Sequence, residues 1–323
     1  FPFPALKHKK LLTFAGKLHI NNFSCIMANV IKIKKGLDIN LKGKASDVLL
    51  NGGKSDSYAI VPDYYNGIVP KVVAKVGEKV KAGSVLMIDK NRPEIKFVSP
   101  VSGEVTAVNR GEKRKVLSVV VKPEAQIEYE DFGKKNVASL KREEVKEAIL
   151  HAGMWPFIKQ RPYDIVASPA DEPRDIFVSA FYSAPLAPNF DFVVKGQEVD
   201  FQTGLDALAK LTDGKVYVGI RKGSSVSVKG VETVEVEGPH PAANVGVQIN
   251  HIKPINKGEV VWTVNPADVI VIGRLFNKGI ADFSRLVVIT GSETTERGYV
   301  KAIAGCTIAS LVDGMIMRGN EDI

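Results

Sequence analysis

VGEKVKAGSVL at residues 76–86 and SPVSGEV at residues 99–105 decide the fold of the first part of the chain. Short β-rich runs in which glycines recur every few residues are typical of a compact antiparallel sandwich. Gly77 and Gly83 suit tight turns that need a positive φ. Leu86 is expected in the small core. The pattern therefore predicts a β-sandwich unit.

This pattern resembles the biotinyl/lipoyl (barrel-sandwich) fold, in which one lysine on an exposed hairpin between the two halves receives the cofactor. Counted from the glycines, that position falls at Arg92 or Pro93, whereas the nearest lysine, Lys90, lies too early. The sequence thus predicts the scaffold without its attachment site. A biotinyl- or lipoyl-type carrier protein with the cofactor on Lys90 is the first alternative function.

The residues after about 130 change to an α/β pattern. Apolar strand-like runs alternate with amphipathic helical runs, which predicts βαβ units and a mostly parallel sheet. The expected elements are a helix capped by Ser139 and ended by Gly153, strands at 176–181, 216–220 and 259–264, a helix at 204–211, a two-stranded ribbon at 225–237, and a helix from Asn265-Pro266 to Gly279.

Motifs for nucleotide, metal or hydrolytic chemistry are missing from the sequence. No G-x-G-x-x-G, G-x-S-x-G or H-E-x-x-H occurs, and Val48 stands where a phosphate loop ending in Gly53-Lys54-Ser55 needs its first glycine. Cys25 and Cys306 are too few to hold a zinc ion or an iron–sulfur cluster. We therefore predict no catalytic residue and no metal site in this chain.

The most unusual string is GPHPAANVGVQIN at residues 238–250. Two prolines around a histidine fix the backbone, and stiff loops of this kind often shape a binding surface. The alternative is a rigid connection between sheet elements. The candidate binding residues of this loop are Gly238, Pro239, His240, Pro241 and Asn244.

At this loop the chain resembles a family, the A subunit of the bacterial Na⁺-translocating NADH:quinone reductase. The resemblance covers essentially all of Met27–Ile323, and the family is more distantly related to the C subunit of the Rnf complex and to the flavin subunit of complex I. The strings that carry it are Ile33–Gly43, Leu150–Arg161, Phe201–Gly214, Gly238–Val247 and Trp262–Phe276.

The resemblance implies an α+β multidomain fold. Residues 27–128 are expected to form a barrel-sandwich (biotinyl/lipoyl-like) domain, and residues 129–282 a Rossmann-like α/β domain. Residues 283–323 are expected to be the start of a ubiquitin-like, soluble-ligand-binding β-grasp domain that is truncated here. Residues 1–26 are interpreted as a non-native or upstream extension, with Met27 as the native start.

The resemblance also implies a role. The chain is expected to be a peripheral, non-catalytic subunit on the cytoplasmic face of the bacterial inner membrane, docked on the membrane subunits. It would bind no redox cofactor itself, since the FAD, FMN, riboflavin and iron–sulfur groups belong to partner subunits. A contribution to quinone binding through the loop at 238–244 is left open, and a soluble flavin or nicotinamide oxidoreductase is the second alternative.

Composition is consistent with a folded protein and excludes a nucleic-acid partner. The 323 residues are 45% hydrophobic and 25% charged, with no apolar run near the ~20 residues of a membrane-spanning helix. Of the net charge of +8, half comes from lysines in the first 26 residues. The remainder is spread over a long body, which is not the footprint of a nucleic-acid-binding surface.

Overall fold

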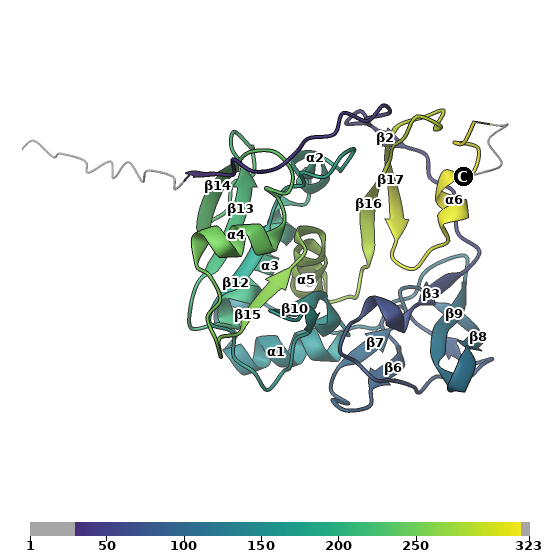
Figure 1. The fold of residues 1–323 in the computed structure, drawn as a ribbon. Helices are drawn as coiled ribbons and strands as arrows, with labels where there is room; N and C mark the ends of the chain where they lie inside the picture. The colour runs from purple at the N-terminus through teal and green to yellow at the C-terminus, as the bar shows by residue number, and fades with distance from the viewer. Residues whose placement is uncertain (1–29, 318–323) are drawn as a thin grey trace, which may run out of the picture.

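The structure is a computed structural model that describes residues 30–317. The interpretation of residues 1–26 as an extension lies outside these residues. Within them the chain forms an α/β unit, a β-sandwich of two small sheets, and a third small sheet that carries a short helix (Figure 1). The expected α+β multidomain class is therefore confirmed.

The α/β unit is built on one mixed sheet with the strand order β1-β14-β13-β12-β15-β10-β11. From β1 to β15 neighbouring strands are parallel, and β10 and β11 add an antiparallel edge. The bounds are Val30–Lys32 (β1), Ile158–Arg161 (β10), Ile165–Val166 (β11), Ile176–Ser179 (β12), Val216–Arg221 (β13), Glu232–Glu237 (β14) and Val261–Val264 (β15).

Helices cover both faces of this sheet, because successive side chains of a strand point to opposite faces. Ile176 and Val178 of β12 pack in the cluster that contains α3 and α5, whereas Phe177 between them packs with Ile249 of α4. The helices of the unit are Arg142–His151 (α1), Phe190–Val194 (α2), Glu198–Lys210 (α3), Val245–Ile252 (α4) and Pro266–Lys278 (α5).

Helix α5 begins and ends where the sequence predicts. The Asn265 side chain accepts a hydrogen bond from the Ala267 amide at 3.0 Å, and Pro266 occupies the first turn. At the other end, Gly279 adopts the left-handed conformation with φ of 73°. Both ends of the helix are thus set by local sequence.

The β-sandwich pairs two small antiparallel sheets, β3-β9-β8-β5 and β4-β6-β7. Gly77 and Gly83 have φ of 86° and 106°, as their turns require, and Leu86 is fully buried. The sandwich predicted from these residues is confirmed. The bounds are Tyr58–Ile60 (β3), Pro70–Val72 (β4), Lys79–Val80 (β5), Val85–Asp89 (β6), Lys96–Val98 (β7), Gly103–Arg110 (β8) and Val116–Pro123 (β9).

The third unit runs in the order strand, strand and helix, in Ser284–Ile289 (β16), Gly298–Ile303 (β17) and Ile308–Val312 (α6). Its sheet is completed by Leu49–Leu50 (β2), which pairs in parallel with β17.

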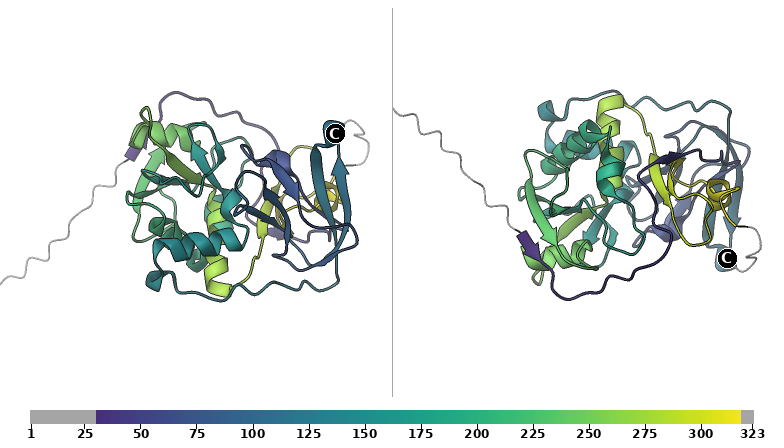
Figure 2. Two further views of the ribbon diagram at one scale, coloured as in Figure 1. Left: turned by 90° about the horizontal axis from the view of Figure 1, so that it is seen from below. Right: turned by 90° about the horizontal axis from the view of Figure 1, so that it is seen from above.

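The segment from residue 30 to residue 50 does not lie in the sheets of the β-sandwich. Its first strand, β1, pairs with β14 of the α/β unit, and its last, β2, pairs with β17 of the third unit. Between them the chain crosses from one unit to the other, as the purple segment shows in Figures 1 and 2. The connecting part of this segment, residues 33–47, is called the strap below.

Two local expectations are wrong. Residues 225–231 do not form a strand, because the Lys229 amide bonds to the Gln202 side chain instead, so β14 alone remains of the expected ribbon and pairs in parallel with β13 and β1. Ser139 ends a short 3-10 turn, and α1 begins at Arg142, where the Lys141 amide donates to the Glu144 carboxylate at 2.8 Å.

Across residues 30–317, none of the helices combines the length and the apolar character that crossing a bilayer requires.

Candidate functional site

The loop after β14 is the candidate site that the sequence singles out, and the strap fixes its backbone. The Ile33 amide donates to Glu237 O at 2.8 Å, where the strand pairing of β1 and β14 ends. The His240 amide donates to Asp38 Oδ1 at 2.9 Å. The Leu37 amide donates to His240 O, also at 2.9 Å. The loop and the strap therefore form one bonded unit.

Glycines allow this close approach. A Cβ at Gly36 would lie 2.1 Å from His240 O. A Cβ at Gly238, whose φ is 139°, would lie 2.3 Å from Ile33 O. Neither position tolerates a larger residue without separating the two segments, since real Cβ atoms do not come so close to backbone oxygens.

The His240 side chain contacts Ser183, which belongs neither to the loop nor to the strap. Its Nδ1 lies 3.1 Å from Ser183 Oγ, which also accepts a hydrogen bond from the Ala243 amide at 3.0 Å. A hydroxyl has one proton to donate, so Ser183 can donate to His240 while it accepts from Ala243. Within residues 30–317 no hydrogen bond is made to His240 Nε2.

The structure separates the candidate residues into two groups. Gly238, Pro239 and His240 lie against the strap, and Pro241 leads into the turn before α4. Asn244 alone lines a cleft of about 600 Å³. This cleft, called the switch cleft below, opens at the carboxyl ends of β12 and β15.

The position of the switch cleft follows from the topology. After β12 the chain moves to one side, to β13 and then β14, and it returns through α4 to β15 on the other side of β12. In open α/β sheets, ligands bind outside the carboxyl ends of the strands at such a reversal. The cleft is lined by residues that follow β12, β14 and β15, among them Phe181, Tyr182, Asn244, Gly246, Asn265 and Asp268.

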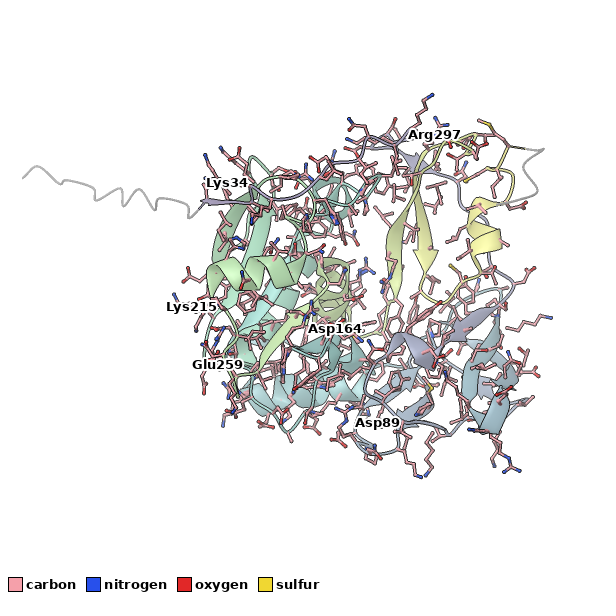
Figure 3. All side chains as sticks on the ribbon, in the orientation of Figure 1. Lys34, Asp89, Asp164, Lys215, Glu259 and Arg297 are labelled. Atoms are coloured by element: carbon pink, nitrogen blue, oxygen red, sulfur yellow. The ribbon has the colours of Figure 1, made fainter. Side chains whose placement is uncertain are left out.

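Charged side chains from β10 and its neighbours face this cleft. Lys159 and Arg161 stand two residues apart on β10 and therefore on one face of the strand. Arg161 Nε lies 3.7 Å from Asp164 Oδ1, and Asp268 Oδ1 lies 3.0 Å from Arg285 Nη2. Asp164, labelled in Figure 3, lies near the middle of the molecule in that view.

Burial shifts the titration of several of these groups. Burial lowers the pKa of the Lys159 ammonium, against the opposing attraction of Asp164 and Asp268. Burial raises the pKa of the Asp268 carboxyl, which the Arg285 guanidinium opposes. The same cause raises the pKa of the Tyr182 phenol to about 12. Perturbed groups gathered in a cleft are typical of functional sites.

Sequence reasoning missed this cleft. The pattern that could have indicated it is Ile-Lys-Gln-Arg at 158–161. There, two basic residues stand two positions apart in a strand whose first residue, Ile158, is buried in the core. Because successive side chains of a strand point to opposite faces, both basic side chains lie on the face opposite Ile158.

A second cleft, of about 730 Å³, adjoins the first beyond Phe181 and Tyr182, which line both. Its walls are formed by the strap and the segment 181–191, together with Arg221 and Tyr299. On the strap, Leu37, Ile39 and Leu41 are 70%, 55% and 55% exposed. The strap therefore presents apolar side chains to the outside beside the loop that it holds.

The hairpin that carries a modified lysine in the biotinyl/lipoyl fold has a different role here. Arg92 donates to Gly67 O at 2.9 Å and to Val166 O of β11 at 3.2 Å, and its Nε pairs with the buried Asp89 at 2.8 Å. The hairpin tip is thus bonded to the edge of the α/β sheet. A carried group must move between active sites, so these contacts argue against the carrier alternative on Lys90, which is exposed.

The side chains of residues 30–317 contain no group of three or more histidines, cysteines, aspartates or glutamates able to hold a metal ion. Cys306 is a free, half-buried thiol whose pKa burial raises.

Comparison with known proteins identifies a family whose two domain models match this chain. Residues 31–124 match the family described as NqrA N-terminal barrel-sandwich hybrid domain, and residues 140–281 match the NqrA second alpha/beta domain. The A subunit of the Na⁺-translocating NADH-quinone reductase of Neisseria meningitidis is 35% identical over 91% of this chain and 67% of its own length. The same subunit of Hahella chejuensis is 36% identical over 88% and 65%. The chain thus spans about two thirds of the length of these relatives.

A solved structure of an NAD⁺-reducing [NiFe]-hydrogenase in the air-oxidized state is 11% identical, with a TM-score of 0.35 over 55% of this chain and 39% of that one.

Proposed function

The chain belongs to the family formed by the A subunit of the Na⁺-translocating NADH-quinone reductase, and we propose that it is a peripheral docking subunit of such a complex without a redox group of its own. The single observation that supports docking most strongly is the loop at 238–244, which the strap holds in one conformation. A pre-ordered loop loses little conformational entropy when a partner binds.

The proposed docking surface consists of this loop and the exposed apolar residues of the strap, Leu37, Ile39 and Leu41. Apolar side chains on the outside of a protein mark interaction sites when they gather beside polar contacts. The proposed occupants are the membrane subunits of the complex, on the cytoplasmic face of the bacterial inner membrane. The FAD, FMN, riboflavin and iron–sulfur groups would be carried by partner subunits.

Two features of the sequence support a chain without a redox group. Two cysteines cannot ligate an iron–sulfur cluster, and no G-x-G-x-x-G is present to approach a dinucleotide pyrophosphate. The family matches end at residues 124 and 281, which supports the division proposed near residues 128 and 282.

A contribution to quinone binding is proposed for the same loop. His240 uses Nδ1 on Ser183, so Nε2 is the atom that can donate to a quinone carbonyl or to a partner's backbone.

Replacing Pro239 and Pro241 together by alanine should weaken assembly roughly tenfold, because each added flexible residue costs about 0.4–1 kcal/mol of ordering. The melting temperature of the isolated chain should change by only about 2 °C, since a loss of this size is small for a chain of this length. The measurements are co-purification of the membrane subunits and quinone-dependent turnover per complex.

The matched control for this double variant is Pro254→Ala, in the exposed loop after α4, which should leave assembly unchanged. Full assembly and normal quinone reduction in the double variant would show that the loop is only a rigid connection.

A further inference from the structure

The switch cleft holds two basic side chains that lack hydrogen-bond acceptors. Within residues 30–317, neither Lys159 nor Arg161 donates a side-chain hydrogen bond, and Arg161 Nε is shielded from solvent as well. Lys159 Nζ instead lies 5.1 Å from the centre of the Tyr65 ring. A half-buried charge without an acceptor is costly, and a bound anion would remove that cost.

The carboxylates of the cleft do not balance these charges. Asp268 is paired with Arg285 at 3.0 Å, and Asp164 lies beside Arg161 at 3.7 Å, which is beyond hydrogen-bond distance. Lys159 has no ion pair within the described residues. The cleft therefore keeps one uncompensated positive charge.

The first turn of α4 lies beside Arg161 and lines the same cleft. Gly246 stands in the first turn of α4, where amide groups have no partner within the helix. A Cβ there would have Arg161 Nη2 as its nearest neighbour, at 3.9 Å, so the guanidinium lies beside the amide groups of this turn.

The rest of the wall is aromatic and apolar. Phe157, Phe181 and Tyr182 line the cleft together with Val264 and Pro266. The volume of about 600 Å³ lies within the range of small-molecule sites, about 300–1,000 Å³. A ligand that fits both parts of the wall has an anionic group at one end and a planar or apolar body at the other.

We propose that the switch cleft is a binding site for a small organic anion, whose phosphate or carboxylate group is held by Lys159 and Arg161 and whose ring or apolar body lies against Phe181 and Tyr182. A neutral ligand would leave Lys159 unpaired, and a cation would be repelled by it. Of the docking loop, only Asn244 lines the switch cleft, and the anion contacts are assigned to Lys159 and Arg161 of β10, so binding can be tested on this chain without the other subunits.

The test is isothermal titration of the full chain with phenyl phosphate, benzoate, inorganic phosphate and phenol at constant ionic strength. We expect saturable one-to-one binding of phenyl phosphate or benzoate, and the stronger of the two identifies the anionic group. Inorganic phosphate, which lacks the ring, and phenol, which lacks the charge, should each bind more weakly. Lys159→Met and Arg161→Gln should each weaken binding about tenfold, the loss expected for one charged hydrogen bond.

The matched control is Lys257→Met, at an exposed loop lysine far along the chain from β10, which should leave the affinity within about twofold of wild type. A second measurement needs no variant: the bound ring-bearing anion should protect Lys159 from acylation, as mapped by mass spectrometry, and should leave Lys257 reactive. Absence of saturable binding by every anion, unchanged affinity in Lys159→Met, or no protection of Lys159 would each overturn the proposal.

Discussion

Replacing Gly273 by alanine should lower the free energy of unfolding by more than about 3 kcal/mol. Gly273 lies on α5 where that helix crosses α3, and a Cβ there would stand 1.7 Å from Asp200 O. A Cβ at Gly204 on α3 would likewise stand 2.1 Å from Val269 O of α5. The new methyl group can be accommodated only if the two helix backbones separate, which would open the core beneath the sheet.

Chemical denaturation monitored by circular dichroism measures this loss. The matched control is Gly246→Ala, also a helical glycine, whose new methyl group would meet nothing closer than 3.9 Å. The control should be neutral or more stable by up to about 1 kcal/mol, as alanine favours the helix. Equal stability of the two variants would mean that the backbones of α3 and α5 do not approach each other closely at Gly204 and Gly273.

Replacing Arg92 by methionine should cost about 3–5 kcal/mol, the range for breaking a buried ion pair by removing one partner. Asp89 is fully buried, and Arg92 is its cationic partner. The variant would leave the carboxylate with backbone donors only, from Val69 at 3.0 Å and Asn91 at 3.2 Å. It would also break the contacts of the hairpin tip with Gly67 and Val166.

The control for Arg92 is Arg110→Met, at an exposed arginine of the same β-sandwich, which should change the unfolding free energy by less than about 0.5 kcal/mol. Asp89→Asn combined with Arg92→Met should lose less than the sum of the single variants, because the two residues share one interaction. Full additivity would indicate that Asp89 and Arg92 do not stabilise each other.

The sequence predicts elements whose ends are set by local chemistry. Asn265, Pro266 and Gly279 define α5 because a side-chain cap, a proline in the first turn and a left-handed glycine each act within a few residues. Gly77 and Gly83 identify the turns of the β-sandwich for the same reason.

The pairing of the strap cannot be predicted in this way. The strands that flank it, β1 and β2, are short, and their partners, β14 and β17, lie some 200 to 250 residues further along the chain. Periodicity reports which residues face inward, and it carries no information on which distant strand completes a sheet. The domain bounds that the resemblance implies assign residues 30–50 to the barrel-sandwich domain, whereas their strands pair with β14 and β17 of the other two units.

The candidate site is predicted only in part. The loop at 238–244 stands out through its prolines, but its bonds to Asp38 and Leu37 depend on the strap. The alternation of Lys159 and Arg161 in the sequence indicates only that they share one face of a strand. Their position beside a cleft follows from the reversal of strand order at β12, which only the three-dimensional topology shows.

The most direct test of the proposed docking role is purification of the complex from membranes of the native host through a tag on this chain, with quantitative identification of what co-purifies. We predict the membrane subunits of an NADH-quinone reductase in amounts equal to this chain, with all bound flavin assigned to those partners. Recovery of the chain without membrane subunits, or with a stoichiometric flavin of its own, would contradict that role.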